Sequence, residues 1–143
     1  NTPAFSVKLS GNQSISETTN TKITFDSEEF DTDGAFASNK FTVPSGKAGI
    51  YFFNSSARID SEVNGNLLIS QLNFYKNGSV FKRNYNYYSD SYIRAFSHTT
   101  SALMDLSVGD YIEMYAYINT VDNSGGNISG LTYSYFSGHK LIT

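Results

Sequence analysis

The stretch YIEMYAYI, from Tyr111 to Ile118, alternates two kinds of side chain. Successive side chains of an extended strand point to opposite faces of its sheet. The aliphatic residues and Met114 therefore share one face, and three tyrosines share the other with Glu113. The aliphatic face predicts burial in a hydrophobic core. A solvated second face normally carries polar residues, so the tyrosines indicate that this face is covered as well.

A second stretch, GIYFFNSSARI from Gly49 to Ile59, has the same two-faced character. Tyr51 and Phe53 share one face of the strand, while Ile50 and Phe52 share the other. In a small β-sandwich the second cover is often another subunit, so we interpret these strands as contacting a second copy of the chain. The alternative is that the aromatic residues are exposed or lie under loops of the same subunit.

Further candidate strands of similar length are separated by turn signals along the whole chain. The clearest is Asn77-Gly78, a pair that supplies the positive φ angles of a tight hairpin. The ten candidates are Ala4–Leu9, Lys22–Asp26, Lys40–Val43, Gly49–Ile59, Leu67–Tyr75, Ser79–Asn84, Tyr92–His98, Ala102–Leu106, Tyr111–Ile118 and Leu131–Ile142. Regular short strands with these turns predict an all-β sandwich or barrel, formed by one domain over residues 1–143.

The composition excludes several classes of protein. The chain has no cysteine, which excludes disulfides, thiolate metal sites and a thiol nucleophile. Its formal net charge is −3 and its lysines and arginines form no cluster, so we expect no nucleic-acid partner. Because no apolar run approaches the roughly 20 residues of a membrane-spanning helix, we expect no membrane insertion.

Six residues between Phe25 and Phe53 are spaced as in the signature of the C1q domain family, which the chain resembles. They are Phe25, Asp31, Phe36, Gly49, Tyr51 and Phe53. One position departs from the pattern, because Phe41 follows Phe36 after four residues where the family has six. A longer gap after Phe41 compensates for this shift and returns Gly49 to its expected place, which indicates a locally reshaped turn.

Four further motifs extend the resemblance over almost the entire chain. PAFSVKL (Pro3–Leu9) is similar to the family's first strand, and FYKNG (Phe74–Gly78) to its hairpin. LSVGDYIEMYAY (Leu106–Tyr117) is similar to its Leu-x-x-Gly-Asp segment, and YFSGHKLI (Tyr135–Ile142) to its closing strand. The resemblance implies a ten-stranded jelly-roll β-sandwich of the C1q and tumour necrosis factor type, assembled as a homotrimer. It also implies a non-catalytic head that binds ligands or receptors, usually on a fibrous stalk.

The two-faced strands and the resemblance together predict the trimer interface. The residues that we expect there are Phe52, Tyr111, Tyr115, Tyr117, Tyr133, Tyr135 and His139. In the closing strand, alternation places Tyr135 and His139 opposite Phe136 and Gly138, which match the core side of the family's strand. His139 stands where the family has phenylalanine. We expect it either close to its symmetry copies on the threefold axis, where its protonation would be unfavourable, or solvated near the end of the strand.

The sequence marks neither a catalytic pair nor a definite metal site. No motif identifies a nucleophile beside a base, so we expect no enzymatic activity. Asp31 and Asp33, in the acidic stretch 26–34, are weak candidates for calcium ligands, and the alternative is a solvated acidic loop. Some C1q relatives bind calcium, but their ligands find no residue-by-residue match here. We therefore expect no cofactor, with calcium as the one possibility.

The segment 84–92 is rich in tyrosine and asparagine and predicts the ligand contact. Its candidate residues are Tyr85, Tyr87, Tyr88, Asp90 and Tyr92. Tyrosine rings beside amides suit a protein or glycan ligand. We therefore interpret the chain as an extracellular trimeric recognition head on a secreted fibre, a cell surface or a virion. The alternatives are a structural trimerisation cap without a ligand and a phage or viral receptor-binding tip. Exposed rings favour recognition, and inward-packed rings favour the cap.

Overall fold

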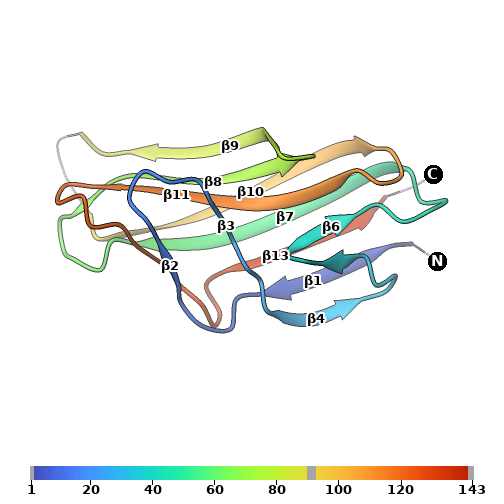
Figure 1. The fold of residues 1–143 in the computed structure, drawn as a ribbon, viewed down its shortest axis with the longest axis horizontal. Helices are drawn as coiled ribbons and strands as arrows, with labels where there is room; N and C mark the ends of the chain where they lie inside the picture. Colours follow the sequence, from blue (N-terminus) through green and yellow to red (C-terminus); the bar gives the residue numbers. More distant parts are fainter. Residues whose placement is uncertain (1, 90–92, 142–143) are drawn as a thin grey trace.

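The computed structural model describes residues 2–89 and 93–141 and has two β-sheets (Figure 1). Its strands are β1 (Ala4–Lys8), β2 (Gln13–Ile15), β3 (Thr21–Lys22), β4 (Ser27–Asp31), β5 (Phe36–Ala37), β6 (Lys40–Thr42), β7 (Gly49–Asp60), β8 (Leu67–Lys76), β9 (Ser79–Tyr87), β10 (Ala95–Leu106), β11 (Tyr111–Thr120), β12 (Gly126–Ile128) and β13 (Tyr135–Lys140). Five of these segments have only two or three residues, so the number of strands depends on how the short ones are treated. The ten strands implied by the resemblance therefore stay an expectation.

The strands form two antiparallel sheets that pack against each other. Sheet A has the order β2-β12-β7-β13-β1-β4, with β10 paired along β7, and sheet B has the order β5-β6-β11-β8-β9, with β3 paired to β11. Figure 1 places the N and C ends of the chain at one end of the molecule. The loops that follow β7, β9 and β11 lie at the opposite end, which we call the distal end. Within the described ranges, no helix is long and apolar enough to cross a membrane.

The core lies between the sheets and confirms the predicted alternation. The aliphatic face of β11 and the Tyr51 face of β7 are both buried. Phe5 of β1 connects the two layers, because its ring stacks on Phe41 at 5.0 Å and meets the Phe136 ring edge-on at 4.9 Å. Gly138 lies in this aromatic cluster, where an added Cβ would come within 2.4 Å of the Phe53 ring. The prediction that Gly138 faces the core is therefore confirmed.

Three strand predictions need correction. The stretches Tyr92–His98 and Ala102–Leu106 were expected to be separate, but one strand, β10, runs from Ala95 to Leu106 and pairs with β7 throughout. The polar residues between them interrupt the apolar pattern without breaking the extended backbone. Tyr92 itself lies outside the described residues. The closing strand begins at Tyr135, four residues later than predicted, because Leu131 adopts a left-handed φ of 58°.

The acidic stretch was expected to follow a strand over Lys22–Asp26, and it forms a strand of its own. Of that prediction only Lys22 belongs to a strand, the two-residue β3, and Ser27–Asp31 forms β4 at the edge of sheet A. An edge strand can direct its carboxylates into solvent, and charges there discourage pairing with another chain. The alternative of a solvated acidic loop is therefore correct about solvation and wrong about the backbone.

Candidate functional site

The residues predicted for the trimer interface divide between the outward faces of the two sheets. Phe52, Tyr135 and His139 belong to sheet A, Tyr111, Tyr115 and Tyr117 belong to sheet B, and Tyr133 lies just before β13. Because the sheets pack face to face, their outward faces point in opposite directions. The structure therefore splits the predicted set into two groups, and contact with a neighbouring subunit stays a prediction for each.

On sheet A, the outward face carries an apolar row across three neighbouring strands. His139 of β13 is opposite Phe52 of β7, which is opposite Leu103 of β10. The Phe52 and His139 rings are 5.8 Å apart, and Leu103 is 58% exposed. Ile50, also exposed, is two residues before Phe52 on β7 and therefore lies on the same face, near the start of that strand. We call Ile50, Phe52, Leu103 and His139 the apolar row.

Most of the rest of this face is polar, apart from exposed Tyr135 of β13 and Phe30 of the edge strand β4, which is 51% exposed and pairs with Ser6. The next outward position on each strand brings together Ser137, Asn54 and Ser101. Beyond β13, the ring of Tyr133 lies against the Arg58 guanidinium, 5.3 Å from ring centre to carbon. The apolar side chains of sheet A that are grouped across neighbouring strands are therefore those of the apolar row, and Phe30 stands apart from them on the edge strand β4.

The outward face of sheet B is aromatic. In the strand register, Tyr117 of β11 and Tyr85 of β9 lie on either side of Gln71 of β8. The rings of Tyr75 and Tyr115 stack with their centres 3.9 Å apart. We call Tyr75, Tyr85, Tyr87, Tyr115 and Tyr117 the tyrosine face. Tyr85 and Tyr87 are each 54% exposed, and the other three are half-buried.

A hydrogen-bonded group of amides lies between these rings. Asn73 Nδ2 and Arg83 Nη1 each donate to Gln71 Oε1 at 3.0 Å. Gln71 and Asn73 are buried although they point outward, because the surrounding side chains cover them. The hydrogen-bonded side chains of Gln71, Asn73 and Arg83 therefore lie between the rings of the tyrosine face and separate them.

The charges at the margin of this face are paired. Glu113, only 6% exposed, forms an ion pair with Lys22 of β3 at 2.8 Å. Lys40 lies over the ring of Tyr111, 4.3 Å from its centre. Burial, with the Glu113 carboxylate close by, raises the pKa of Tyr115, so its phenol is neutral at physiological pH.

The predicted ligand residues separate into two environments. Tyr85 and Tyr87 belong to the tyrosine face, whereas Tyr88 is half-buried and its ring is 6.4 Å from that of Phe96. Asp90 and Tyr92 lie outside the described residues. The structure therefore joins two predicted ligand tyrosines with tyrosines of β11 that were predicted for the subunit interface. Sequence alternation shows that each set shares a face, but it does not show which strands are neighbours.

Sequence reasoning missed a buried polar chain between the sheets. His98 Nε2 lies 2.7 Å from Ser70 Oγ, and His98 Nδ1 contacts Asn84 Oδ1. Burial lowers the pKa of His98 to about 4. In a neutral imidazole, Nδ1–H can donate a hydrogen bond to Asn84 Oδ1 while Nε2 accepts a hydrogen bond from the Ser70 hydroxyl. No motif in the sequence marks these three residues.

This order of groups resembles a nucleophile, a base and the residue that orients the base. Ser70 and His98 are each 1% exposed, so the surrounding protein covers the hydroxyl. A nucleophile needs a site for the reacting atom beside it. The hydrogen bonds of Ser70, His98 and Asn84 therefore satisfy polar atoms that are buried between the sheets.

The candidate calcium ligands organise the turn between β4 and β5. The two carboxylate oxygens of Asp31 accept hydrogen bonds from Ala35 N at 3.0 Å and Phe36 N at 2.8 Å. Asp33 Oδ1 accepts one from Thr32 Oγ1 at 2.9 Å. Across residues 2–89 and 93–141, no three histidine, aspartate or glutamate side chains are grouped closely enough to hold a metal ion. Calcium at Asp31 and Asp33 stays a prediction.

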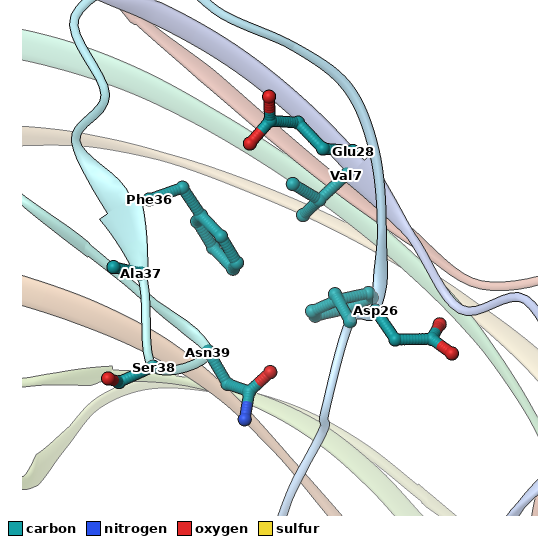
Figure 2. Close-up of a pocket in the computed structure, with 8 residues that line it drawn as sticks. Val7, Asp26, Glu28, Phe36, Ala37, Ser38 and Asn39 are labelled. Carbon is teal, nitrogen blue, oxygen red and sulfur yellow. The ribbon is translucent and has the colours of Figure 1, made fainter.

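A small pocket opens beside this turn, where the edges of the two sheets diverge. Its volume is about 220 Å³, and Figure 2 shows the Phe36 ring pointing into it. Asp26 lies on one side of the pocket and Asn39 on the other. Hydrogen bonds from Ser10 Oγ and Ser10 N lower the pKa of Asp26, which is therefore ionised at neutral pH.

Two antiparallel sheets packed face to face, with β13 and β1 between β7 and β4, define a jelly-roll sandwich. The model of the C1q domain matches residues 4–141, and the chain belongs to the C1q domain family. No curated protein sequence matches it significantly.

Solved structures share the fold at low sequence identity. The globular domain of zebrafish complement 1qA protein is 19% identical, with a TM-score of 0.67 over 98% of both chains. Murine APRIL, a tumour necrosis factor family protein, is 13% identical in its structure at pH 8.5, with a TM-score of 0.64 over 99% of this chain and 100% of that one. The all-β fold of the C1q and tumour necrosis factor type, expected from the resemblance, is therefore confirmed.

Proposed function

We propose that this chain is a non-catalytic recognition head that assembles as a homotrimer and is displayed outside the cell. The single observation that carries the proposal is that the sandwich presents two differently built outward faces. Sheet A has the apolar row, which suits contact with another subunit. Sheet B has the tyrosine face, which suits contact with a ligand.

Self-association is supported by the chemistry of the apolar row. Leu103, on the strand β10 that pairs along β7, is 58% exposed and lies beside the half-buried ring of Phe52. A large apolar side chain grouped with others on a flat sheet marks an interaction surface, because burying it removes apolar area from water. Three copies related by a threefold axis would bury the row in a closed ring. Domains of the C1q family are typically trimeric, which agrees with this assignment.

Recognition is supported by the exposure of Tyr85 and Tyr87. A trimerisation cap without a ligand needs no exposed aromatic residues, whereas tyrosine gives a large amphipathic contact at low cost in side-chain entropy. The strand that carries both residues, β9, runs toward the distal end, away from the termini (Figure 1). A phage or viral receptor-binding tip would use the same surface, so this alternative differs in source and not in chemistry. The non-catalytic assignment is supported by the burial of Ser70.

The trimer is tested by measuring the mass of the purified chain by light scattering at micromolar concentration. Wild type is expected at three times the chain mass of 15.8 kDa. Leu103→Glu is expected to give monomers, because a buried unpaired carboxylate is costly. Val80→Glu places the same charge on sheet B, at a valine that is 40% exposed, and is expected to stay trimeric. A monomeric wild type would refute the assembly.

Recognition is tested separately, by probing a printed panel of extracellular proteins and oligosaccharides with the labelled wild-type chain. We expect at least one specific partner, whose binding Tyr85→Ala weakens. If no partner on the panel is bound by a sample that is trimeric, the cap is the better assignment.

A further inference from the structure

We propose that the tyrosine face binds a neutral oligosaccharide, with sugar rings stacked on Tyr85, Tyr87 and Tyr117. This inference rests on the proposed recognition function and names its ligand class and its surface. The geometry, the hydrogen-bonding groups and the charge of the face all match a neutral oligosaccharide.

The spacing of the rings fits an extended chain of sugar units. Tyr85 and Tyr117 lie on either side of Gln71, two strand spacings apart, which is roughly 10 Å across the sheet. Tyr85 and Tyr87 are two residues apart on β9, roughly 7 Å along the strand. A flat sheet therefore presents separate aromatic platforms at intervals that successive units of one oligosaccharide can reach.

The chemistry of the surface matches both sides of a sugar ring. The C–H groups on one side of a pyranose are apolar and pack against an aromatic face, while its hydroxyls need donors and acceptors. Arg83 and Gln71 lie between the rings. Arg83 Nη1 donates a hydrogen bond to Gln71 Oε1, which also accepts one from Asn73. The remaining guanidinium N–H groups of Arg83 and the Gln71 Nε2 amide are the nearest donors for a hydroxyl. The tyrosine hydroxyls add groups that both donate and accept.

The charge of the face is complementary to a ligand without charge. Its carboxylate, Glu113, is already paired with Lys22 at 2.8 Å, so it offers no attraction to a cationic peptide. Arg83 lies among the rings and its bond to Gln71 holds it against the sheet, while Lys22, the register partner of Tyr115, is neutralised by Glu113. An acidic glycan would call for several cations. Desolvating a neutral polar ligand costs less than desolvating a charged one.

A protein ligand fits this face less well. Protein interfaces concentrate their binding energy in pockets that take large anchoring side chains. The aliphatic residues that point outward here are Ile69 and Val80, at two separate positions of the sheet. Hydrogen-bonded amides occupy the centre, where a protein interface would be apolar.

The experiment uses the purified chain and soluble hexasaccharides of glucose, mannose, galactose or xylose, with a sialylated and a sulfated oligosaccharide for comparison. Binding is measured by calorimetric titration and by saturation transfer from tyrosine ring protons to sugar protons. We expect at least one neutral hexasaccharide to bind with saturation transfer. Tyr85→Ala and Tyr117→Ala are each expected to weaken it about tenfold, and Tyr85→Phe to keep most of the affinity because it keeps the ring.

Tyr133→Ala is the matched control, because Tyr133 is 52% exposed but lies away from sheet B. It is expected to leave sugar affinity unchanged. The inference is overturned if no neutral hexasaccharide binds, if the sialylated or sulfated compound binds more tightly, or if Tyr133→Ala costs as much as Tyr85→Ala. Tyr85 is exposed, so its variants keep the test valid even if Tyr117→Ala fails to fold. Trimer mass is measured on each sample, and a trimer that binds only proteins would overturn this inference while leaving the proposed function in place.

Discussion

Acidification is expected to destabilise the domain through His98. Burial lowers the pKa of its imidazole to about 4 from the ordinary value of 6.5, so the folded state stays neutral where the unfolded state is protonated. The unfolded state binds more protons below pH 6.5, and stability therefore falls as the pH drops. At pH 4 the loss in the free energy of unfolding is nearly complete and amounts to about 3 kcal/mol, from the linkage between proton binding and folding. About 2 kcal/mol of it is lost between pH 7.5 and pH 5.

The measurement is urea unfolding followed by circular dichroism at pH 7.5 and pH 5, at one protein concentration. His98→Gln removes the titrating group and is expected to abolish the His98 share of the loss, although the variant itself is less stable at pH 7.5. The chain has two histidines, so His139→Phe is the matched control and is expected to keep the His98 share of the loss. The reasoning is refuted if wild type and His98→Gln lose the same stability. If His98→Gln does not fold, an NMR titration of the wild type decides, because a His98 ring signal that moves with a midpoint near 6.5 contradicts the argument.

Two further predictions concern the core and a buried carboxylate. Gly138→Ala is expected to destabilise the domain by roughly 1–3 kcal/mol, because the new methyl group would overlap the Phe53 ring, and a melting temperature equal to wild type would contradict this. Burial alone would raise the pKa of Asp60, but hydrogen bonds from two arginines and a backbone amide lower it overall. Asp60→Ala is therefore expected to cost roughly 1.5–3 kcal/mol in urea unfolding, because it removes the hydrogen bonds to a buried carboxylate while the arginines, 29% and 48% exposed, keep contact with water, and a loss below about 0.5 kcal/mol would contradict this.

Local side-chain patterns predicted the core well, because they depend on one strand at a time. The alternation in Tyr111–Ile118 identifies its buried face without any knowledge of its neighbours. Alternation grouped Phe136 with Gly138, the resemblance to the family's closing strand placed that face toward the core, and both residues are buried. The short strands β2, β5 and β12 were missed, since two or three residues cannot display a period. The edge strand β4 was missed because its carboxylates reflect solvent exposure more than backbone conformation.

The candidate site was harder to predict, because a face that spans several strands depends on register. Tyr85 and Tyr117 are 32 positions apart in the sequence and become neighbours only through Gln71 of the strand between them. Periodicity identified the tyrosines of β11 and composition those of β9, so the sequence predicted two separate groups with two separate roles. No local signal marks Gln71 as the residue that joins them.

A strand that is apolar on both faces must be covered on both, but its sequence does not say whether the second face is covered by the same subunit or by another one. For β11 much of that cover is intramolecular: the Tyr75 ring stacks on Tyr115, and Lys22 reaches across to Glu113. For β7 the comparable residue is Phe52, and its neighbour Leu103 is 58% exposed. The physical argument for contact with a second subunit therefore weakens for the tyrosines of β11 and strengthens for sheet A. Because contacts within the subunit already stabilise the tyrosine face, it needs no partner subunit and is available to bind a ligand.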